Sequence, residues 1–441
     1  MQSPDKRTIL TRFFPLALCL ALLLPCAGCA AARTAPSAPA NAPARAIEAP
    51  LRQAEPAPEP EPTPTPAPEP EAAPLALTDA QSPYRTSVLQ DGDDFTFAAF
   101  APGEAVTLTA EEPVAALYLV WTTRPAPWTL RTPAGDLPCG TQGYFHELVR
   151  LPAPAAELTL ILLETDEAEV RLADVCAFTA GRLPDWVQDW QPPCERADLL
   201  LISSHADDEF IFFGGVLPTY AAERGLEVQV AYMVDHYASH PYRWHELLNG
   251  LWTAGVTRYP VTGGFPDGRF DFLWQAQAFY GEEDVLAWQV GLLRRFRPSV
   301  VVTHAETGEY NNSTHKLNAF TAEQAVASAA DGAQFPGSAA AYGVWDTPKL
   351  YIHLWGEDPT VLDFEHPIEA LGGATAFETA ERAFDCHRSQ RRSYRVYGAE
   401  YPHYDCHVYG LYRSLVGPDE TKDDLFEHLA PGPAPTPVIA K

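Results

Sequence analysis

One short segment of the chain combines a histidine and two carboxylates directly after an apolar run. The run Leu199–Ile202 leads into Ser204–Glu209, which contains His205, Asp207 and Asp208. The apolar run predicts a buried strand, and open α/β sheets hold their ligands outside the carboxyl ends of their strands. A catalytic zinc ion commonly takes three histidine or carboxylate ligands and keeps one position open for water. We therefore expect His205 and Asp208 to bind a metal ion, with Asp207 left to handle protons.

A third ligand is expected from a second segment farther along the chain. The β-rich run 299–303 leads into the polar segment 304–315, and a helix is predicted from residue 316 to about 330. His315 would lie in the first turn of that helix, close to the same edge of the sheet. His315 is therefore the candidate for the remaining ligand.

The two segments together resemble the motifs of the PIG-L/LmbE-like zinc-dependent N-acetylglucosaminyl deacetylases. The first family motif reads Ala/Ser-His-Pro/x-Asp-Asp-Glu and the second reads Gly-Glu-Tyr-Gly-His-x-x-His, and this chain has Ser204–Glu209 and Gly308–His315 at these places. The resemblance covers roughly residues 198–429. The segments 386–390 and 409–419 resemble the C-terminal part of secreted bacterial members.

The resemblance implies a zinc-dependent hydrolase that removes the acetyl group from an N-acetylglucosamine-type amino sugar. By position, it implies His205, Asp208 and His315 as the zinc ligands and Asp207 as the general base on the zinc-bound water. Hydrolysis of an amide on zinc requires metal-binding and proton-accepting residues of these types, because zinc polarises the amide carbonyl and lowers the pKa of bound water from about 16 towards 7. Two nitrogens and a carboxylate oxygen also accept other divalent ions such as Fe²⁺.

The second motif departs from the family pattern at one position with a catalytic role. Asn312 stands where the family has its first histidine, which is expected to stabilise the oxyanion of the tetrahedral intermediate. An asparagine amide can donate to an oxyanion, and losing one such donor costs roughly 100- to 1000-fold in rate. His304 and His353, near the ends of predicted strands, are candidates to substitute for it. The alternative function is a zinc-containing, glycan-binding surface lipoprotein with little or no activity.

The remainder of the region predicts a Rossmann-like α/β fold with a parallel sheet, over residues 195–429. Alternating strands and helices are typical of parallel βαβ units. We expect strands at 228–234 and 349–355, and helices at 210–224, 244–254 and 284–296. The loops after the strands are rich in aromatic and polar residues, and Arg243 is the candidate there for contact with substrate. A hydrolase of a non-sugar amide would use the same metal site.

A separate all-β domain is predicted before the hydrolase, over residues 78–182. Short alternating runs at 94–97, 116–121, 158–162 and 170–172 lie between proline and glycine turns. They predict a β-sandwich that resembles the carbohydrate-binding jelly rolls of extracellular hydrolases. This is an analogy at the level of the fold and identifies no site.

The amino terminus predicts export. Basic residues precede an apolar stretch, Phe13–Pro25, which is too short to span a bilayer and fits a secretory signal. Ala27–Cys29 resembles the lipobox of bacterial lipoproteins, so residues 1–29 are predicted to be the signal peptide and Cys29 the lipidated residue. The alternative is an ordinary signal peptide cut near Ala30 to Ala32. Both kinds of signal peptide predict that the chain is exported. Lipidation would make it a membrane lipoprotein facing the periplasm or the cell surface.

Low-complexity segments flank the predicted domains. Residues 30–77 are rich in Ala, Pro and Glu, with 13 of the 43 prolines between Pro36 and Pro74. Such a segment cannot bury apolar surface and predicts a disordered, extended tether. Residues 430–441 are predicted to be a disordered tail.

Charge and cysteine content limit the partners. The net charge of −28, from 58 acidic and 30 basic residues, predicts that the chain repels nucleic acid. No protein partner is indicated. Five of the 8 cysteines lie beyond residue 29, an odd number that leaves one unpaired within a single chain. A disulfide between Cys386 and Cys406 is favoured over metal binding by these cysteines with His387 and His407.

Overall fold

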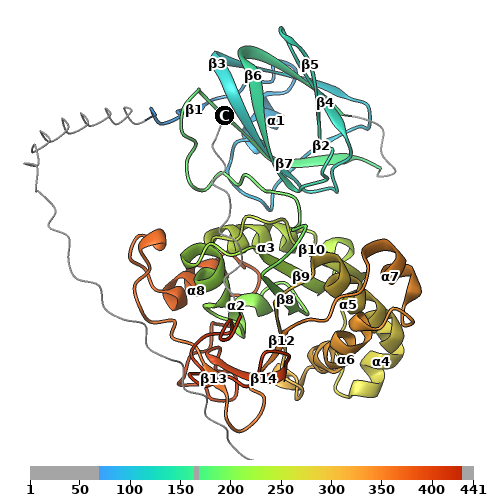
Figure 1. Cartoon of the computed structure of the whole chain (residues 1–441). Coiled ribbons are helices and arrows are strands. Elements are labelled where there is room, and N and C mark those ends of the chain that lie inside the picture. The colour runs from blue at the N-terminus through green and yellow to red at the C-terminus, as the bar shows by residue number, and fades with distance from the viewer. Residues whose placement is uncertain (1–68, 163–167, 430–441) are drawn as a thin grey trace, which may run out of the picture. The chain divides into compact units, whose positions relative to one another are not determined.

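The computed structural model describes residues 69–162 and 168–429 (Figure 1). The predicted signal peptide, the lipidation site Cys29, most of the tether and the tail 430–441 lie outside the described residues. Among the described helices, none is long and apolar enough to cross a membrane.

The first part of the described chain is a β-rich region. It contains β1 (Pro74–Leu75), β2 (Ala98–Phe100), β3 (Ala105–Trp121), β4 (Trp128–Thr132), β5 (Gly135–Cys139), β6 (His146–Ile161) and β7 (Val170–Phe178), with the short helix α1 (Pro83–Val88). The strands form one antiparallel sheet in the order β1-β7-β3-β6-β4-β5, with β2 on β7. The long strands β3 and β6 carry bulges in their pairing, which bend them. Leu117, Trp121 and Leu158 lie in its core.

Two predictions for this region were wrong in detail. The run 94–97 is a turn before β2 rather than a strand, because Asp91 and Asp93 accept hydrogen bonds from the segment and close it locally. The tether was predicted to reach residue 77, but Ala72 and Leu77 are buried and β1 pairs with β7. Two prolines in and near β1 give the sequence of this edge strand the composition of the proline-rich tether. The predicted runs 116–121, 158–162 and 170–172 fall largely within β3, β6 and β7.

The second part is an α/β region with a mixed sheet. Its strands are β8 (Leu199–Ser203), β9 (Val228–Val234), β10 (Val261–Phe265), β11 (Val300–Thr303), β12 (Lys349–His353), β13 (Thr360–Val361) and β14 (Val408–Ser414). The order is β10-β9-β8-β11-β12-β14-β13, and the first five strands run parallel. The predicted all-parallel sheet was wrong at one edge, since β14 and β13 are antiparallel. The long irregular connection before β14 lets the chain return in the opposite direction.

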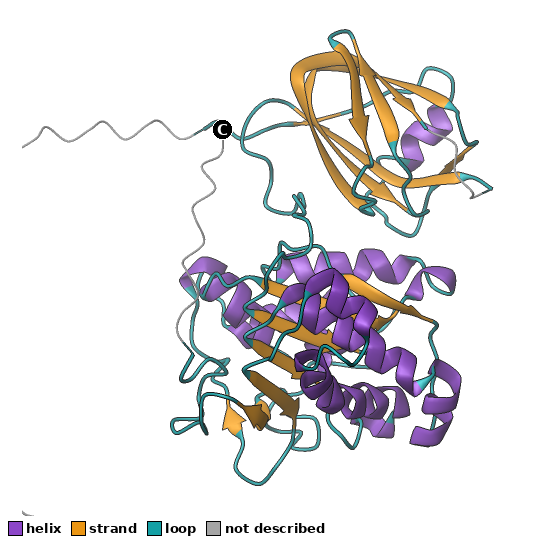
Figure 2. Cartoon of the chain, turned by 45° about the vertical axis from the view of Figure 1, so that its right-hand side comes forward, coloured by secondary structure: helices purple, strands orange, loops and turns teal. Residues whose placement is uncertain are grey.

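Helices cover both faces of this sheet (Figure 2). They are α2 (Asp208–Ile211), α3 (Tyr242–Thr253), α4 (Leu273–Tyr280), α5 (Glu282–Phe296), α6 (Ser313–Ala330), α7 (Pro336–Tyr342) and α8 (Ala376–Asp385). Leu199 and Leu201 of β8 point into the core shared with α3 and α8. Leu200 and Ile202 point into the core shared with α5 and α6. This alternation within the apolar run 199–202 is expected of a central parallel strand.

The helix predicted over 210–224 is broken in the middle. Helix α2 ends at Ile211, residues 212–215 form a turn, and helical structure resumes at Val216. Gly214 has a φ of +43°, and a Cβ there would stand 2.3 Å from the sulfur of Cys406. The chain therefore bends at this glycine to let the C-terminal segment approach.

The two cysteines predicted to pair are both free. Cys406 lies buried against Gly214, whereas Cys386 lies near the hydroxyl of Thr253. The predicted disulfide was therefore wrong. The two dipeptides look alike in sequence, but they follow different elements.

Candidate active site

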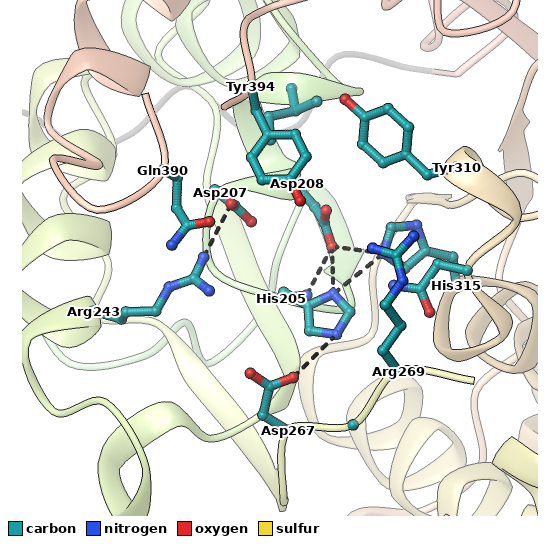
Figure 3. A pocket seen from close by; sticks show the side chains of 13 residues that line it. His205, Asp207, Asp208, Arg243, Asp267, Arg269, Tyr310, His315, Gln390 and Tyr394 are labelled. Atoms are coloured by element: carbon teal, nitrogen blue, oxygen red, sulfur yellow. Dashed lines mark hydrogen bonds and ion pairs between the residues drawn. The ribbon is translucent and has the colours of Figure 1, made fainter. Parts of the chain in front are cut away.

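The structure brings the three predicted ligands together at the carboxyl edge of β8 and β11 (Figure 3). His205 follows β8, Asp208 opens α2, and His315 lies in the first turn of α6. The Nδ1 atom of His205 is 3.1 Å from Oδ2 of Asp208 and 3.2 Å from Nε2 of His315. The third side of the triangle, from His315 Nε2 to Asp208 Oδ2, measures 3.2 Å.

This triangle fits a single small cation. Ligand atoms about 2.0–2.1 Å from a tetrahedral ion stand about 3.3 Å from one another, close to the observed separations. All three side chains are buried, and they line one wall of a cavity of about 240 Å³. The ion would thus contact solvent only through that cavity.

The charge balance of the triangle also suits a cation. Burial alone raises the pKa of Asp208, but His315 and His205 outweigh it and hold the pKa well below the usual range. Burial lowers the pKa of His315, yet Asp208 and Glu309 raise it to about 10. A buried histidine with so high a pKa sits in a field that favours positive charge. A divalent cation would take the place of that proton.

Glu309 supports the histidines from behind. Its carboxylate accepts hydrogen bonds from Nδ1 of His315 at 2.9 Å, His304 at 2.9 Å and His353 at 2.7 Å. A carboxylate behind a metal-binding histidine fixes the ring and makes its other nitrogen more basic. With Nδ1 of His315 donating to Glu309, Nε2 is left as the metal-binding atom.

His304 and His353 do not reach the cavity, contrary to the prediction that they could contact the substrate in place of the family's first histidine. Both side chains are fully buried, and neither lines the cavity. Nε2 of His304 accepts from the backbone N–H of Ser204 at 2.9 Å, and Nε2 of His353 donates to the carbonyl of Asp405 at 3.0 Å. Strand ends indicated the correct edge of the sheet, but these rings point inward to Glu309.

Asp207 lies beside the triangle and does not belong to it. Its φ of +115° is in a strained region for a residue with a Cβ, and this turns its carboxylate towards the cavity. Oδ2 is 3.0 Å from Nη2 of Arg243, which extends from α3 and also donates to the carbonyl of Ala206. Burial raises the pKa of Asp207, Arg243 lowers it and Asp208 raises it, with a net value of about 6. A carboxylate with such a pKa can exchange a proton near neutral pH.

Glu209 holds the strained backbone of Asp207. One of its oxygens accepts from the backbone N–H of Asp207 at 2.6 Å, and the other lies 3.1 Å from Nε2 of His387. All of these groups are buried. The C-terminal segment that contains His387 is thereby tied to the turn that carries Asp207.

Asn312 lines the cavity as the N-cap of α6. Its Oδ1 accepts from the backbone N–H of Thr314 at 3.0 Å. This bond leaves the NH₂ group as the part of the side chain that can donate to a ligand.

Several cavity residues were not predicted from the sequence. Asp267 lies 3.8 Å from Nε2 of His205 and 3.5 Å from Nδ1 of His236. In Figure 3, Asp267 lies below the triangle, the side chain of Arg269 extends up to overlap His315 in this view, and Tyr310 and Tyr394 lie above the triangle. Asp267 follows β10, so its position after a strand was the sequence feature that could have identified it as a site residue. That strand contains two glycines and does not show strand alternation.

Part of this chain is similar to known proteins. Residues 200–326 match the family described as PIG-L, GlcNAc-PI de-N-acetylase. The 1D-myo-inositol 2-acetamido-2-deoxy-alpha-D-glucopyranoside deacetylase of Geodermatophilus obscurus is 29% identical over 180 residues, covering 35% of this chain and 60% of that protein. The enzyme of the same name from Mycobacterium leprae is 28% identical over 217 residues, covering 41% and 65%.

The solved structure of N,N'-diacetylchitobiose deacetylase from Pyrococcus horikoshii is also similar, with 20% identity, a TM-score of 0.35, and coverage of 44% of this chain and 71% of that chain. The chain spans about six tenths of the length of the curated relatives it matches.

Proposed function

We propose that this chain, in which residues 200–326 form a PIG-L family domain, is a metal-dependent hydrolase that removes the acetyl group from an N-acetylglucosamine-type sugar. The observation that carries the proposal is the triangle of His205, Asp208 and His315, with mutual distances of 3.1 to 3.2 Å, beside a carboxylate with a pKa of about 6. The curated relatives are named as deacetylases of such a sugar, which supports the substrate class.

His205, Asp208 and His315 would hold the ion, for which we propose Zn²⁺, with Fe²⁺ as the alternative. When bound, the ion would polarise the acetamide carbonyl and acidify water. Asp207 accepts the proton of the attacking water and returns it to the leaving amine nitrogen. The ion pair with Arg243 holds the Asp207 carboxylate in place for both transfers.

Asn312 is proposed as the donor to the oxyanion of the tetrahedral intermediate. Its cap bond to Thr314 fixes the amide, so the NH₂ group requires no reorganisation when negative charge develops on the acetyl oxygen. A neutral amide donor is expected to be weaker here than a protonated imidazole.

The cellular setting of the proposal comes from the sequence alone. We propose that the chain is exported and anchored to the membrane through a lipid at Cys29, facing the periplasm or the cell surface. Its substrate would then be an envelope or extracellular glycan. The β-rich region would be a carbohydrate-binding sandwich that keeps the hydrolase near such a glycan.

A second candidate function is a zinc-containing, glycan-binding lipoprotein with little or no activity. The observation that favours it is Asn312, at the place of a family histidine. Metal content does not distinguish the two functions, because both keep the ligands.

Acetate release from N-acetylglucosamine oligomers distinguishes them. The zinc-loaded protein is expected to release acetate, and Asp207→Asn is expected to lower the rate by about 100- to 10,000-fold while keeping the metal. Glu306→Gln, which removes an exposed carboxylate outside the cavity, serves as the control. Absence of acetate from the metal-loaded, folded wild type would favour the binding protein.

A further inference from the structure

A second cavity lies next to the catalytic cavity and shares Tyr394 with it. It has a volume of about 630 Å³ and lies between α8 and the segment 391–396. The ring of Tyr394 is half-buried, and its hydroxyl makes no hydrogen bond among the residues described. An unpartnered phenol thus stands where the two cavities meet.

The catalytic cavity by itself is small for the proposed substrate. Its volume of about 240 Å³ is below the roughly 300–1000 Å³ of most ligand sites. It provides space for one sugar ring and its acetamide. Any further part of a substrate must leave this cavity, and Tyr394 on its wall also borders the second cavity.

One short segment forms the wall between the cavities. Gln390 lines the catalytic cavity, Arg391 and Arg395 line the second, and Tyr394 lines both. The backbone N–H groups of Gln390 and Arg391 donate to the carbonyl of His387 at 2.8 and 2.9 Å. His387 in turn contacts Glu209, which accepts a hydrogen bond from the backbone N–H of Asp207. The wall is therefore fixed relative to Asp207.

The lining of the second cavity suits a neutral, hydroxyl-rich ligand. Arg382, Arg391 and Arg395 are balanced by Glu378, Glu381 and Asp385. Sugar hydroxyls donate to carboxylates and accept from guanidinium groups, so both kinds of side chain can bind a sugar. The aromatic ring of Tyr394 offers a face against which the C–H side of a sugar can pack.

We infer that the second cavity binds the neighbouring sugar unit of a glycan whose N-acetylated unit occupies the catalytic cavity. The preferred substrate is then an oligosaccharide of at least two units rather than a free monosaccharide. This inference rests on the proposed function and deepens it, because it identifies the size class of the substrate.

The test compares acetate release from N-acetylglucosamine and from its β-1,4-linked dimer, trimer and tetramer, using the zinc-loaded full chain. The matched variants are Arg391→Ala and Arg392→Ala, which are adjacent arginines of which only the first lines the second cavity. Glu381→Gln tests the opposite wall without changing side-chain size.

The wild type is expected to show a higher kcat/KM for oligomers than for the monosaccharide. Arg391→Ala and Glu381→Gln are expected to lower kcat/KM for the oligomers about tenfold and to leave that for the monosaccharide unchanged. Arg392→Ala should change neither. Equal kcat/KM for all chain lengths, or an equal loss on monosaccharide and oligomer in Arg391→Ala, would overturn the inference while acetate release would leave the proposed function standing.

Absence of acetate from every substrate would instead remove the proposed function. In that case calorimetric binding of the tetramer decides the inference. Weaker binding in Arg391→Ala than in Arg392→Ala would retain the cavity as a glycan site. Equal binding by the two variants would remove it.

Discussion

Two groups of buried histidines in this chain have opposite electrostatic surroundings. In the catalytic cluster, His315 contacts Asp208 and Glu309, and these carboxylates raise its pKa to about 10. In the second group, Nε2 of His146 on β6 lies 3.0 Å from Nδ1 of His245 on α3. Burial lowers the pKa of both rings in this pair.

The difference shows what turns buried imidazoles into a metal site. Both groups place ring nitrogens about 3 Å apart in the interior. Only the catalytic cluster has carboxylates within contact distance that offset positive charge. Within the described part of the chain, the pair His146–His245 belongs to no set of three potential ligand atoms. The variants below test this contrast.

Among the variants compared below, the largest expected effect concerns the donor to the oxyanion. Asn312→Ala should lower kcat by roughly 100- to 1000-fold, because the developing negative charge loses a fixed donor. Asn312→His should restore activity to at least the wild-type rate. Initial rates of acetate release measure both variants. Asn311→Ala, at the preceding residue, is the control, and a loss in that variant equal to the loss in Asn312→Ala would contradict the assignment.

The next effect concerns the support behind the ligands. Glu309→Gln keeps the shape of the side chain but removes the negative charge that faces His304, His315 and His353. We expect metal affinity to fall about 10- to 100-fold. Competition with a chromogenic chelator measures it. Glu306→Gln removes an exposed carboxylate nearby, and its affinity should equal that of the wild type.

A smaller effect concerns the pH dependence of catalysis. Asp207 must be ionised to accept a proton, so kcat/KM should rise with pH through about 6 and fall below that value. Arg243 lowers the pKa of Asp207, so Arg243→Met should move the acid limb upward by about one pH unit, a roughly tenfold loss at acidic pH.

Arg243→Lys retains the positive charge and should keep the acid limb near its wild-type position. An unchanged limb in Arg243→Met would show that Asp207 does not control the pH profile.

The smallest effect concerns the neutral histidine pair. Because the folded pKa of His245 is lowered, its contribution to stability is complete above the unfolded value of about 6.5 and is lost as the pH falls below it. Urea unfolding at pH 7.5 and 5.5, with chelator present, should show a smaller loss in His245→Gln than in the wild type, by about 1 kcal/mol. Equal losses would mean that His245 is protonated without cost to the fold.

Local patterns explain why part of the site could be predicted from the sequence. His205, Asp207 and Asp208 follow an apolar strand within a few residues, so their place at the sheet edge follows from chain direction alone. His315 required only the start of the next helix. The β-rich region and the central parallel strands were likewise visible as short apolar runs.

The remaining features depend on contacts between distant segments. Tyr394 and Gln390 lie in an irregular segment whose place is set by His387 and Glu209, a pairing across 178 positions. The break in the helix after Ile211 depends on Cys406 approaching Gly214. His304 and His353 point away from the cavity because the Nδ1 atom of each ring donates a hydrogen bond to Glu309. Contacts between distant segments leave no periodic pattern in the sequence from which they could be predicted.

Calorimetric titration of chelator-treated protein with Zn²⁺ tests the central claim most directly. We predict one tight equivalent in the wild type, in Asp207→Asn and in His245→Ala, and none in His205→Ala or His315→Ala. One equivalent bound with unchanged affinity by His205→Ala and His315→Ala would contradict the account.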